Sequence, residues 1–568
     1  MEYYRWSWPE DLKGSEAYDA SVTLFCLQGL VNRSPDKRLY IEMTPASRNW
    51  RAKLEKPPSS LASIGWKTLM DAGEVLELGM PYVKCVILWD PSVPATVNVA
   101  TTMAGIEQGL VLTSARYGEL KERLAGLPVL SLCGMFDGKE TGSAKNDAYR
   151  WAMRRYLSAG LCSREYMCYY TDSLTERDEG KLTYTCQRDF AVWERAFVMD
   201  LSPWADESPF LEPEQEKGLD ASTMEMLFGE MEKQTQGKKP FELCGFFNFE
   251  KYSMYGRNQT SRHGPVQTEW ETVWRLSPHG GFQNTVTNDS MNQSFHAQMP
   301  MANLKNTRPP KEEKWDPDTL YLSFFMADYD STWPLYEVLE QIWDDPERGS
   351  IPLAWGINPN LSRIYPDLIS YFYATATPND YFTSDASAAG YFNPNRVRES
   401  FWPAMAAFQK EYFEKLDLHC APMILEWEPL SERSLDEFSR FAPDGISTII
   451  EDFHRGVGVG VQPDPFLWKG NMVVDRLWNS VDTSDPERAA GCILDITDSP
   501  AALEKNDNLA LMRVIWIRPE RVCRIVEAFR RLYGQRHPGR KVEIVDIYTY
   551  YRLRRQWLRQ REAGKAQK

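Results

Sequence analysis

The chain has 568 residues, with 65 lysines and arginines against 80 aspartates and glutamates, and a formal net charge of −15. Its 43% hydrophobic and 26% charged residues are typical of a globular protein and exclude a fibre or a disordered chain. The acidic balance without a basic run argues against a nucleic-acid partner, because phosphate binding needs clustered lysines and arginines. The composition therefore favours a neutral or weakly charged ligand.

The sequence also bears on compartment. No apolar stretch approaches the roughly 18 residues of a membrane span, so we expect no membrane partner. The first residues lack a charged region followed by an apolar one, so no signal peptide is predicted in this chain. The 10 cysteines form no CxxC pair, which favours reduced thiols over a disulfide framework. We expect a cytoplasmic protein, or a secreted one whose signal peptide is absent from this chain.

The first 238 residues alternate short apolar runs with helical patterns. Helices are predicted over Ala17–Leu30 and Asp147–Ser158. Strands are predicted at Arg38–Met43, Cys85–Trp89, Leu110–Thr113, Val129–Leu132 and Met167–Tyr170. This alternation predicts two or three small α/β domains. The polar stretch Thr235–Pro240 is the predicted boundary, which divides the chain into residues 1–238 and 239–568.

In residues 239–568 the alternation of predicted strands and helices is clearer. Strands are predicted at Phe241–Phe249, Leu320–Met326, Ile351–Trp355, Tyr381–Thr383, Pro422–Trp427, Ser447–Ile450, Met472–Val474, Leu511–Ile517 and Val542–Val545. Helices are predicted at Pro334–Asp344, Leu361–Ala374, Val397–Leu416, Leu435–Phe441 and Pro519–Leu532. Strands that alternate with helices predict a parallel sheet, either open or closed into a barrel. The basic tail Arg552–Lys568 is predicted to be a solvated terminal helix.

Carboxylates follow many of these strands at the point where each strand ends. They are Glu250, Asp328, Asp330, Asp385, Glu426, Glu428, Glu451, Asp452 and Asp546. Catalytic residues of βα architectures gather at that end of the strands, so this pattern predicts an acidic cleft. Two carboxylates in different surroundings can act as a proton donor and as a base or nucleophile, which glycoside cleavage needs. Any single strand-end acid can equally be a helix cap or an ion-pair partner.

Aromatic and histidine residues accompany the acids. Trp333, Trp355 and Trp427 lie at or just after strand ends, where a sugar ring could stack on them. His296 and His454 lie in polar, loop-like surroundings, and with Asp328 or Asp330 they could instead ligate a metal ion. The sequence has no HExxH motif, no P-loop and no GxSxG motif.

Three segments, in collinear order, resemble the GxGYxYP family, a group assigned to the glycoside hydrolases. The stretch Cys26–Arg33 (CLQGLVNR) resembles the N-terminal signature of that family, and Val542–Tyr551 resembles its last strand and helix entry. The stretch Ala386–Pro394 (ASAAGYFNP) resembles the motif that names it, with Ala388 in place of the first glycine and Phe392-Asn393 before the proline. The resemblance implies a C-terminal (β/α) barrel-like domain preceded by smaller α/β domains.

The leading hypothesis is a glycoside hydrolase that cleaves a glycosidic bond with paired carboxylates, with carbohydrate as substrate and no cofactor or metal. The resemblance extends to Ala327–Ser331, similar to an acidic strand end of many members, although Tyr329 replaces a glycine. The catalytic candidates are Asp328 and Asp330, with Asp452, Glu250 and Glu426 as possible partners. The expected substrate-binding residues are Asn292, His296, Trp333, Trp355, Tyr391, Trp427 and His454.

Two other functions stay open. A metal-dependent carbohydrate esterase or deacetylase would use Asp328 or Asp330 with histidines to hold an ion that activates water. A non-catalytic glycan-binding protein would have kept the barrel and lost its chemistry. The replaced glycines at Ala388 and Tyr329 favour that last alternative.

Overall fold

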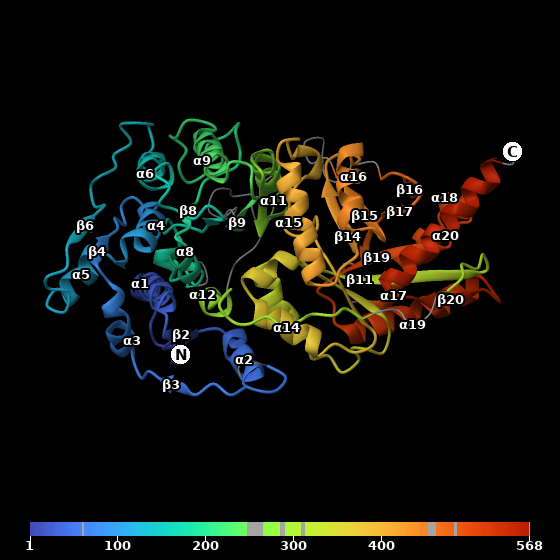
Figure 1. The fold of residues 1–568 in the computed structure, drawn as a ribbon, viewed down its shortest axis with the longest axis horizontal. Helices are drawn as coiled ribbons and strands as arrows, with labels where there is room; N and C mark the ends of the chain where they lie inside the picture. The colour runs from blue at the N-terminus through green and yellow to red at the C-terminus, as the bar shows by residue number, and fades with distance from the viewer. Residues whose placement is uncertain are drawn as a thin grey trace. The chain divides into compact units, whose positions relative to one another are not determined.

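The fold is described from a computed structural model of the chain. The structure describes residues 1–59, 62–182, 185–246, 265–284, 290–307, 313–451, 462–481 and 485–566. The chain divides into two compact units, and many of their elements are labelled in Figure 1. The first unit comprises Met1–Met301, Ser362–Leu368 and Arg396–Ala404, and the second comprises Ala302–Leu361, Ile369–Asn395 and Met405–Lys568.

The described strands of the first unit form three parallel sheets, in the orders β2-β1-β3, β5-β4-β6 and β10-β9-β7-β8. These strands are β1 (Glu2–Ser7), β2 (Lys37–Glu42), β3 (Trp66–Thr68), β4 (Cys85–Leu88), β5 (Gly109–Leu112), β6 (Val129–Ser131), β7 (Tyr166–Tyr169), β8 (Phe197–Met199), β9 (Phe241–Gly245) and β10 (Gly281–Asn284). The helices are α1 (Gly14–Asn32), α2 (Pro45–Leu54), α3 (Ala72–Gly79), α4 (Thr96–Glu107), α5 (Ser114–Leu120), α6 (Ala144–Ala152), α7 (Glu176–Glu179), α8 (Arg188–Glu194), α9 (Leu219–Thr235), α11 (Pro265–Leu276) and α12 (Gln293–His296). The predicted α/β alternation is therefore present.

Helix α1 is the buried centre of this unit. Its residues from Ser21 to Asn32 are all buried, the polar ones included, and the helix packs against α3, α7, α8 and strand β5. Gly29 allows α8 to approach closely, because a Cβ at this position would lie 2.4 Å from the carbonyl oxygen of Asp189. The predicted boundary near Pro240 falls between α9 and β9, and β9 pairs with β7 of the same unit.

The second unit contains two sheets among its described strands, in the orders β13-β12-β11-β19-β18, with β20 beside β11, and β14-β15-β17-β16. Its strands are β11 (Thr319–Tyr329), β12 (Leu353–Ile357), β13 (Asp380–Thr383), β14 (Cys420–Glu426), β15 (Gly445–Ile450), β16 (Phe466–Trp468), β17 (Met472–Arg476), β18 (Trp478–Val481), β19 (Leu509–Ile515) and β20 (Lys541–Ile544). The further helices of the chain are α13 (Leu339–Trp343), α14 (Pro366–Ala374), α15 (Trp402–Lys415), α16 (Glu432–Phe441), α17 (Pro486–Thr497), α18 (Pro500–Lys505), α19 (Pro519–Arg536) and α20 (Ile547–Ala566). All strand pairs of these two sheets are parallel except β16 with β17.

The terminal helix α20 differs from the prediction of a solvated tail. It packs against β11, β16, β17 and β19 (Figure 1). Four of its side chains, those of Tyr550, Leu553, Arg554 and Trp557, are buried. The i, i+3, i+4 and i+7 spacing of these residues places them on one face of the helix, which the basic composition of the tail conceals.

Two further findings bear on compartment. Within the described ranges, no helix combines the length and the apolar composition that crossing a membrane requires. All ten cysteines are free thiols, and most of them are buried.

Candidate functional site

Strand β11 ends in an irregular turn that carries the two first candidates. The register between β11 and β12 shifts between Met326 and Tyr329, and Asp328 has a φ of 70°. This shift leaves Tyr329 fully buried, with its ring centroid 6.2 Å from that of Trp355, while Asp328 and Asp330 on either side are partly exposed. Such bulges and left-handed residues re-aim side chains at functional sites.

A third carboxyl group, that of Asp385, holds this turn in place. Asp385 follows β13, is fully buried, and accepts hydrogen bonds at Oδ2 from the N–H groups of Asp328 (2.8 Å) and Tyr329 (3.2 Å). The neighbouring strand β12 leaves room for it. A Cβ on Gly356 would lie 2.5 Å from Asp385 Oδ2 and 2.6 Å from the ring of Phe325, so only glycine fits there.

Strand β19 supplies a cation and an aromatic side chain to the same turn. Arg513 forms an ion pair with the Asp328 carboxylate. Trp516, just beyond the strand, donates a hydrogen bond from Nε1 to the main-chain oxygen of Asp328 at 2.9 Å. Its ring lies edge-on to Trp333 with centroids 5.3 Å apart, and it is 40% exposed. Trp333 and Trp516 therefore form an aromatic pair beside the acidic turn. We call Asp328, Asp330, Asp385 and Arg513 the acid cluster.

The charges of the acid cluster perturb one another. Burial, and then the negative charge of Asp328, raise the pKa of Asp330 to about 7. Burial, followed by repulsion from Asp330 and Asp328, raises the pKa of Asp385 well above its ordinary value. Burial acts against the Arg513 guanidinium, but the attraction of Asp328, Asp385 and Asp330 raises its pKa, so this side chain stays positively charged. The cluster thus combines an ion pair with two acids whose pKa values are raised, that of Asp330 to about neutral pH.

The loop after β13, which carries the sequence ASAAGYFNP, is buried and held at several points. The N–H of Ser387 donates to the Met423 oxygen at 2.9 Å. Gln409 accepts from the Ala389 N–H at 2.6 Å and donates to the Ala389 oxygen at 3.1 Å. Asn358, after β12, accepts from the Asp385 N–H at 2.9 Å and donates to the Ala386 oxygen at 3.1 Å. These contacts fix where Asp385 lies.

Ala388 adopts a conformation suited to glycine, with a φ of 107°. A side chain at such an angle is strained, and glycine relieves that strain. We expect Ala388→Gly to raise the free energy of unfolding by about 1 kcal/mol, measured as a rise in apparent Tm by calorimetry. The control is Ala389→Gly, whose residue is buried without a positive φ and whose substitution is expected to lower the Tm. A fall in Tm for Ala388→Gly would contradict the strain argument.

The other candidates of the second unit are buried or partly buried, and Glu426 and Trp355 are hydrogen-bonded within the fold. Glu426 is buried at the end of β14, where its Oε2 accepts from the Asn395 N–H and its Oε1 from the Trp427 N–H, both at 2.9 Å. Trp427 is partly exposed beside it. Trp355 is fully buried on β12 and donates from Nε1 to Asp380 Oδ1 at 2.8 Å. Tyr391 is buried in the loop after β13.

Two candidates belong to the first unit and make hydrogen bonds within it. Asn292 Oδ1 accepts from Gln28 Nε2 at 2.7 Å and from the Ile41 N–H at 2.8 Å, so it joins α1 to β2. His296 is fully buried and lies 2.8 Å from Asp367 through Nδ1. Glu250, Asp452 and His454 lie outside the described residues.

Metal binding was the open alternative for Asp328 and Asp330. In the described ranges, no group of three or more His, Cys, Asp or Glu side chains is arranged to hold a metal ion. Of the two histidines considered for that site, His296 is paired with Asp367 of the first unit.

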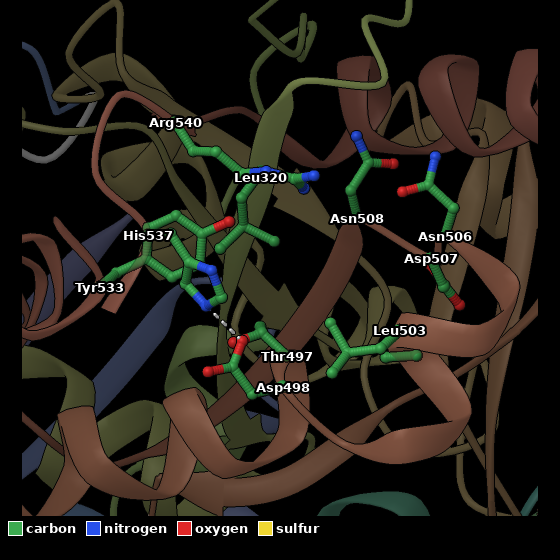
Figure 2. Close-up of a pocket in the computed structure, with 11 residues that line it drawn as sticks. Leu320, Thr497, Asp498, Leu503, Asn506, Asp507, Asn508, Tyr533, His537 and Arg540 are labelled. Carbon is green, nitrogen blue, oxygen red and sulfur yellow. Dashed lines mark hydrogen bonds and ion pairs between the residues drawn. The ribbon is translucent and has the colours of Figure 1, made fainter. Parts of the chain in front are cut away.

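A pocket of about 170 Å³ lies at the opposite end of the strands, beside Leu320 at the start of β11 and Asn508 before β19 (Figure 2). Its polar groups contact one another. His537 points to Asp498, with Nε2 2.8 Å from Oδ1, and Asn508 donates to the main-chain oxygens of Asp316 and Thr319. The pocket therefore does not show the feature of the acid cluster, which is a set of neighbouring carboxyl groups with raised pKa values beside a cation.

Sequence reasoning found Asp328 and Asp330 but missed most of what surrounds them. Asp385 was one of many strand-end acids and was not selected, while Arg513 and Trp516 were not recognised. One signal was present for Arg513. It is a charge in the middle of the apolar run Leu511–Ile517, and a charge in a buried strand needs a partner.

Comparisons with known proteins agree with this architecture. Residues 318–487 match a family described as "GxGYxYP putative glycoside hydrolase C-terminal domain", and residues 83–160 match "GxGYxYP_N second domain". The fold is similar to a solved structure described as "a putative hydrolase from Bacteroides thetaiotaomicron VPI-5482". The TM-score is 0.72 at 16% sequence identity, over 98% of this chain and 95% of that one. No curated protein sequence matches the chain.

Proposed function

Because the chain belongs to the GxGYxYP family, we propose that it is a glycoside hydrolase whose catalytic acids are Asp328 and Asp330. The proposal rests on one observation: two carboxylates of a single turn have different surroundings. Asp328 faces the cation of Arg513, whereas Asp330 has a pKa raised to about 7 by burial and by Asp328. Such a pair supplies an ionised group and a proton donor at the same pH.

The reaction follows from this division. Asp330 donates its proton to the glycosidic oxygen, the bond between that oxygen and the anomeric carbon breaks, and Asp328 faces the positive charge that develops on the sugar ring. Water supplies the hydroxyl group of the product and returns a proton to Asp330. The rings of Trp333 and Trp516, beside the turn, provide apolar faces on which a sugar could stack.

The second unit is proposed to be a (β/α) barrel. Each of its two sheets would form one part of the barrel wall, with the strands of one sheet following those of the other. Two links support this. After β13, Ser387 is hydrogen-bonded to Met423 and Leu425 of β14. Leu477 alone separates β17 from β18, and its N–H extends the ladder between β17 and β15 by donating to the Thr448 oxygen at 3.2 Å. The strand order β11-β12-β13-β14-β15-β17-β18-β19 would then close on β11, which pairs with β19. In such a barrel the acid cluster lies at the catalytic end.

A screen of aryl glycosides and oligosaccharides between pH 4 and pH 9 tests the function. We expect hydrolysis of at least one glycosidic linkage, with a decline of kcat/KM above about pH 7 as Asp330 loses its proton. Acetylated sugars, with and without a chelator, form the second arm of the screen. Release of acetate that the chelator abolishes, without glycoside cleavage, would contradict the hydrolase and favour the metal-dependent esterase.

A further inference from the structure

The carboxyl group of Asp385 has two oxygens with different environments. Oδ2 accepts the N–H groups of Asp328 and Tyr329. Oδ1 is also buried, and no hydrogen-bond donor of the described residues reaches it. Two neighbours fix the position of the carboxyl group. Asn358 accepts a hydrogen bond from the main-chain N–H of Asp385, and Gly356 leaves just enough space for Oδ2.

The charged groups that face Asp385 are Asp328 and Asp330 from the end of β11 and Arg513 from β19. Within the described part of the chain, the cation of this set is Arg513, which forms an ion pair with Asp328. A further negative charge, on the fully buried carboxyl of Asp385, would have to share this cation with Asp328, and burying such a charge is costly. A neutral carboxylic acid avoids this cost and carries an O–H group that can donate a hydrogen bond.

We propose that Asp385 is a positioning residue that stays a neutral acid, fixes the Asp328–Asp330 turn through Oδ2 and donates its O–H from Oδ1 to the Asp330 carboxylate. This inference rests on the proposed hydrolase function. When Asp330 transfers its proton to the glycosidic oxygen, the hydrogen bond from Asp385 stabilises the carboxylate that remains. Water returns the proton to Asp330, and Asp385 keeps its own proton throughout.

The loop Ala386–Pro394, whose motif names the family, would then serve to position Asp385. Ser387, Ala388 and Gly390 of this loop all have positive φ angles, and the loop is buried. Its contacts with Asn358, Met423 and Gln409 set the depth of Asp385 beneath the turn. The loop thus positions Asp385 through main-chain hydrogen bonds, and its own side chains do not carry the reacting carboxylates.

Two substitutions of Asp385 test whether its carboxyl group acts as a neutral hydrogen-bond donor or as an ionised carboxylate. Asp385→Asn keeps an oxygen for the two N–H groups and an N–H donor in place of the O–H, so we expect kcat to stay within about threefold of the parent. Asp385→Ala removes both contacts, and we expect a loss of about 100-fold, as for a displaced catalytic group. An Asn variant as inactive as Asp330→Asn would overturn the proposal, as would an Ala variant as active as the parent.

Thermal unfolding tests the proton without any substrate. A group with a raised pKa in the folded state contributes stability that is complete below its unfolded pKa, near 4, and is lost as pH rises toward the folded value. Asparagine does not titrate, so the Tm of Asp385→Asn minus that of the parent should grow from pH 4 to pH 8. The exposed Asp495→Asn on α17 controls for the loss of a surface carboxylate. A constant difference would overturn the neutral acid, even if the hydrolase activity is found. A growing difference would support it, even if the glycan screen fails.

Discussion

Asp330→Asn lowers the kcat of glycoside hydrolysis by about 10²–10⁴-fold, because it removes the proton donor of the proposed reaction. Asparagine has nearly the size and shape of aspartate, so the turn after β11 and its hydrogen bonds to Asp385 are expected to persist. The measurement is steady-state kinetics on the best substrate of the glycan screen. Substrates with a highly acidic leaving group need little proton donation, and for these the loss is expected to be smallest.

The control for this prediction is Asp318→Asn, at the other end of β11, where the side chain is exposed. It should keep the kcat of the parent. If Asp330→Asn hydrolyses glycosides at the rate of the parent, Asp330 is not the acid, and the proposed division of roles is wrong.

The same substitution has a consequence for stability. Burial and the charge of Asp328 raise the pKa of Asp330 to about 7 in the folded protein, above the ordinary aspartate value of about 3.9. The native protein therefore holds a proton that the unfolded chain releases between about pH 4 and pH 7. The parent therefore loses stability over this window as the pH rises. Asp330→Asn lacks this loss, and its apparent Tm at pH 8 is expected to exceed that of the parent.

Arg554→Leu is expected to lower the free energy of unfolding by about 3–5 kcal/mol, because it leaves the buried Asp475 carboxylate without its ion-pair partner and leaves Asp507 with only its longer ion pair to Arg476. Arg554 on α20 donates from Nε to Asp475 Oδ2 at 2.7 Å and forms an ion pair with Asp507. The three side chains are between 1% and 5% exposed. In calorimetry the apparent Tm should fall by roughly 5–15 °C.

The matched control is Arg559→Leu, on the same helix and exposed, with a long contact of 3.4 Å to the Gly470 oxygen. Its change is expected to stay within about 0.5 kcal/mol. Equal effects of the two substitutions would show that charge on α20 in general, and not the buried ion pairs, stabilises the second unit.

Local patterns of the sequence were enough to place most strands. Apolar runs such as Leu320–Met326 and Tyr381–Thr383 correspond to β11 and β13, because consecutive buried residues favour strands of parallel sheets that are covered on both faces. Short or polar elements were missed, among them β1, β3 and β18. These strands depend on pairing with a neighbour more than on their own composition.

The sequence by itself determined that acids follow parallel strands, and this placed Asp328 and Asp330 at one end of the sheet. Only the tertiary structure decided which partners these acids have. Asp385 is 57 residues from Asp328, and Arg513 is 185 residues away. They meet because β12 and β19 flank β11 and β13 lies beside β12. Strand order and register arise from the packing of the whole unit, and no local pattern of residues encodes them.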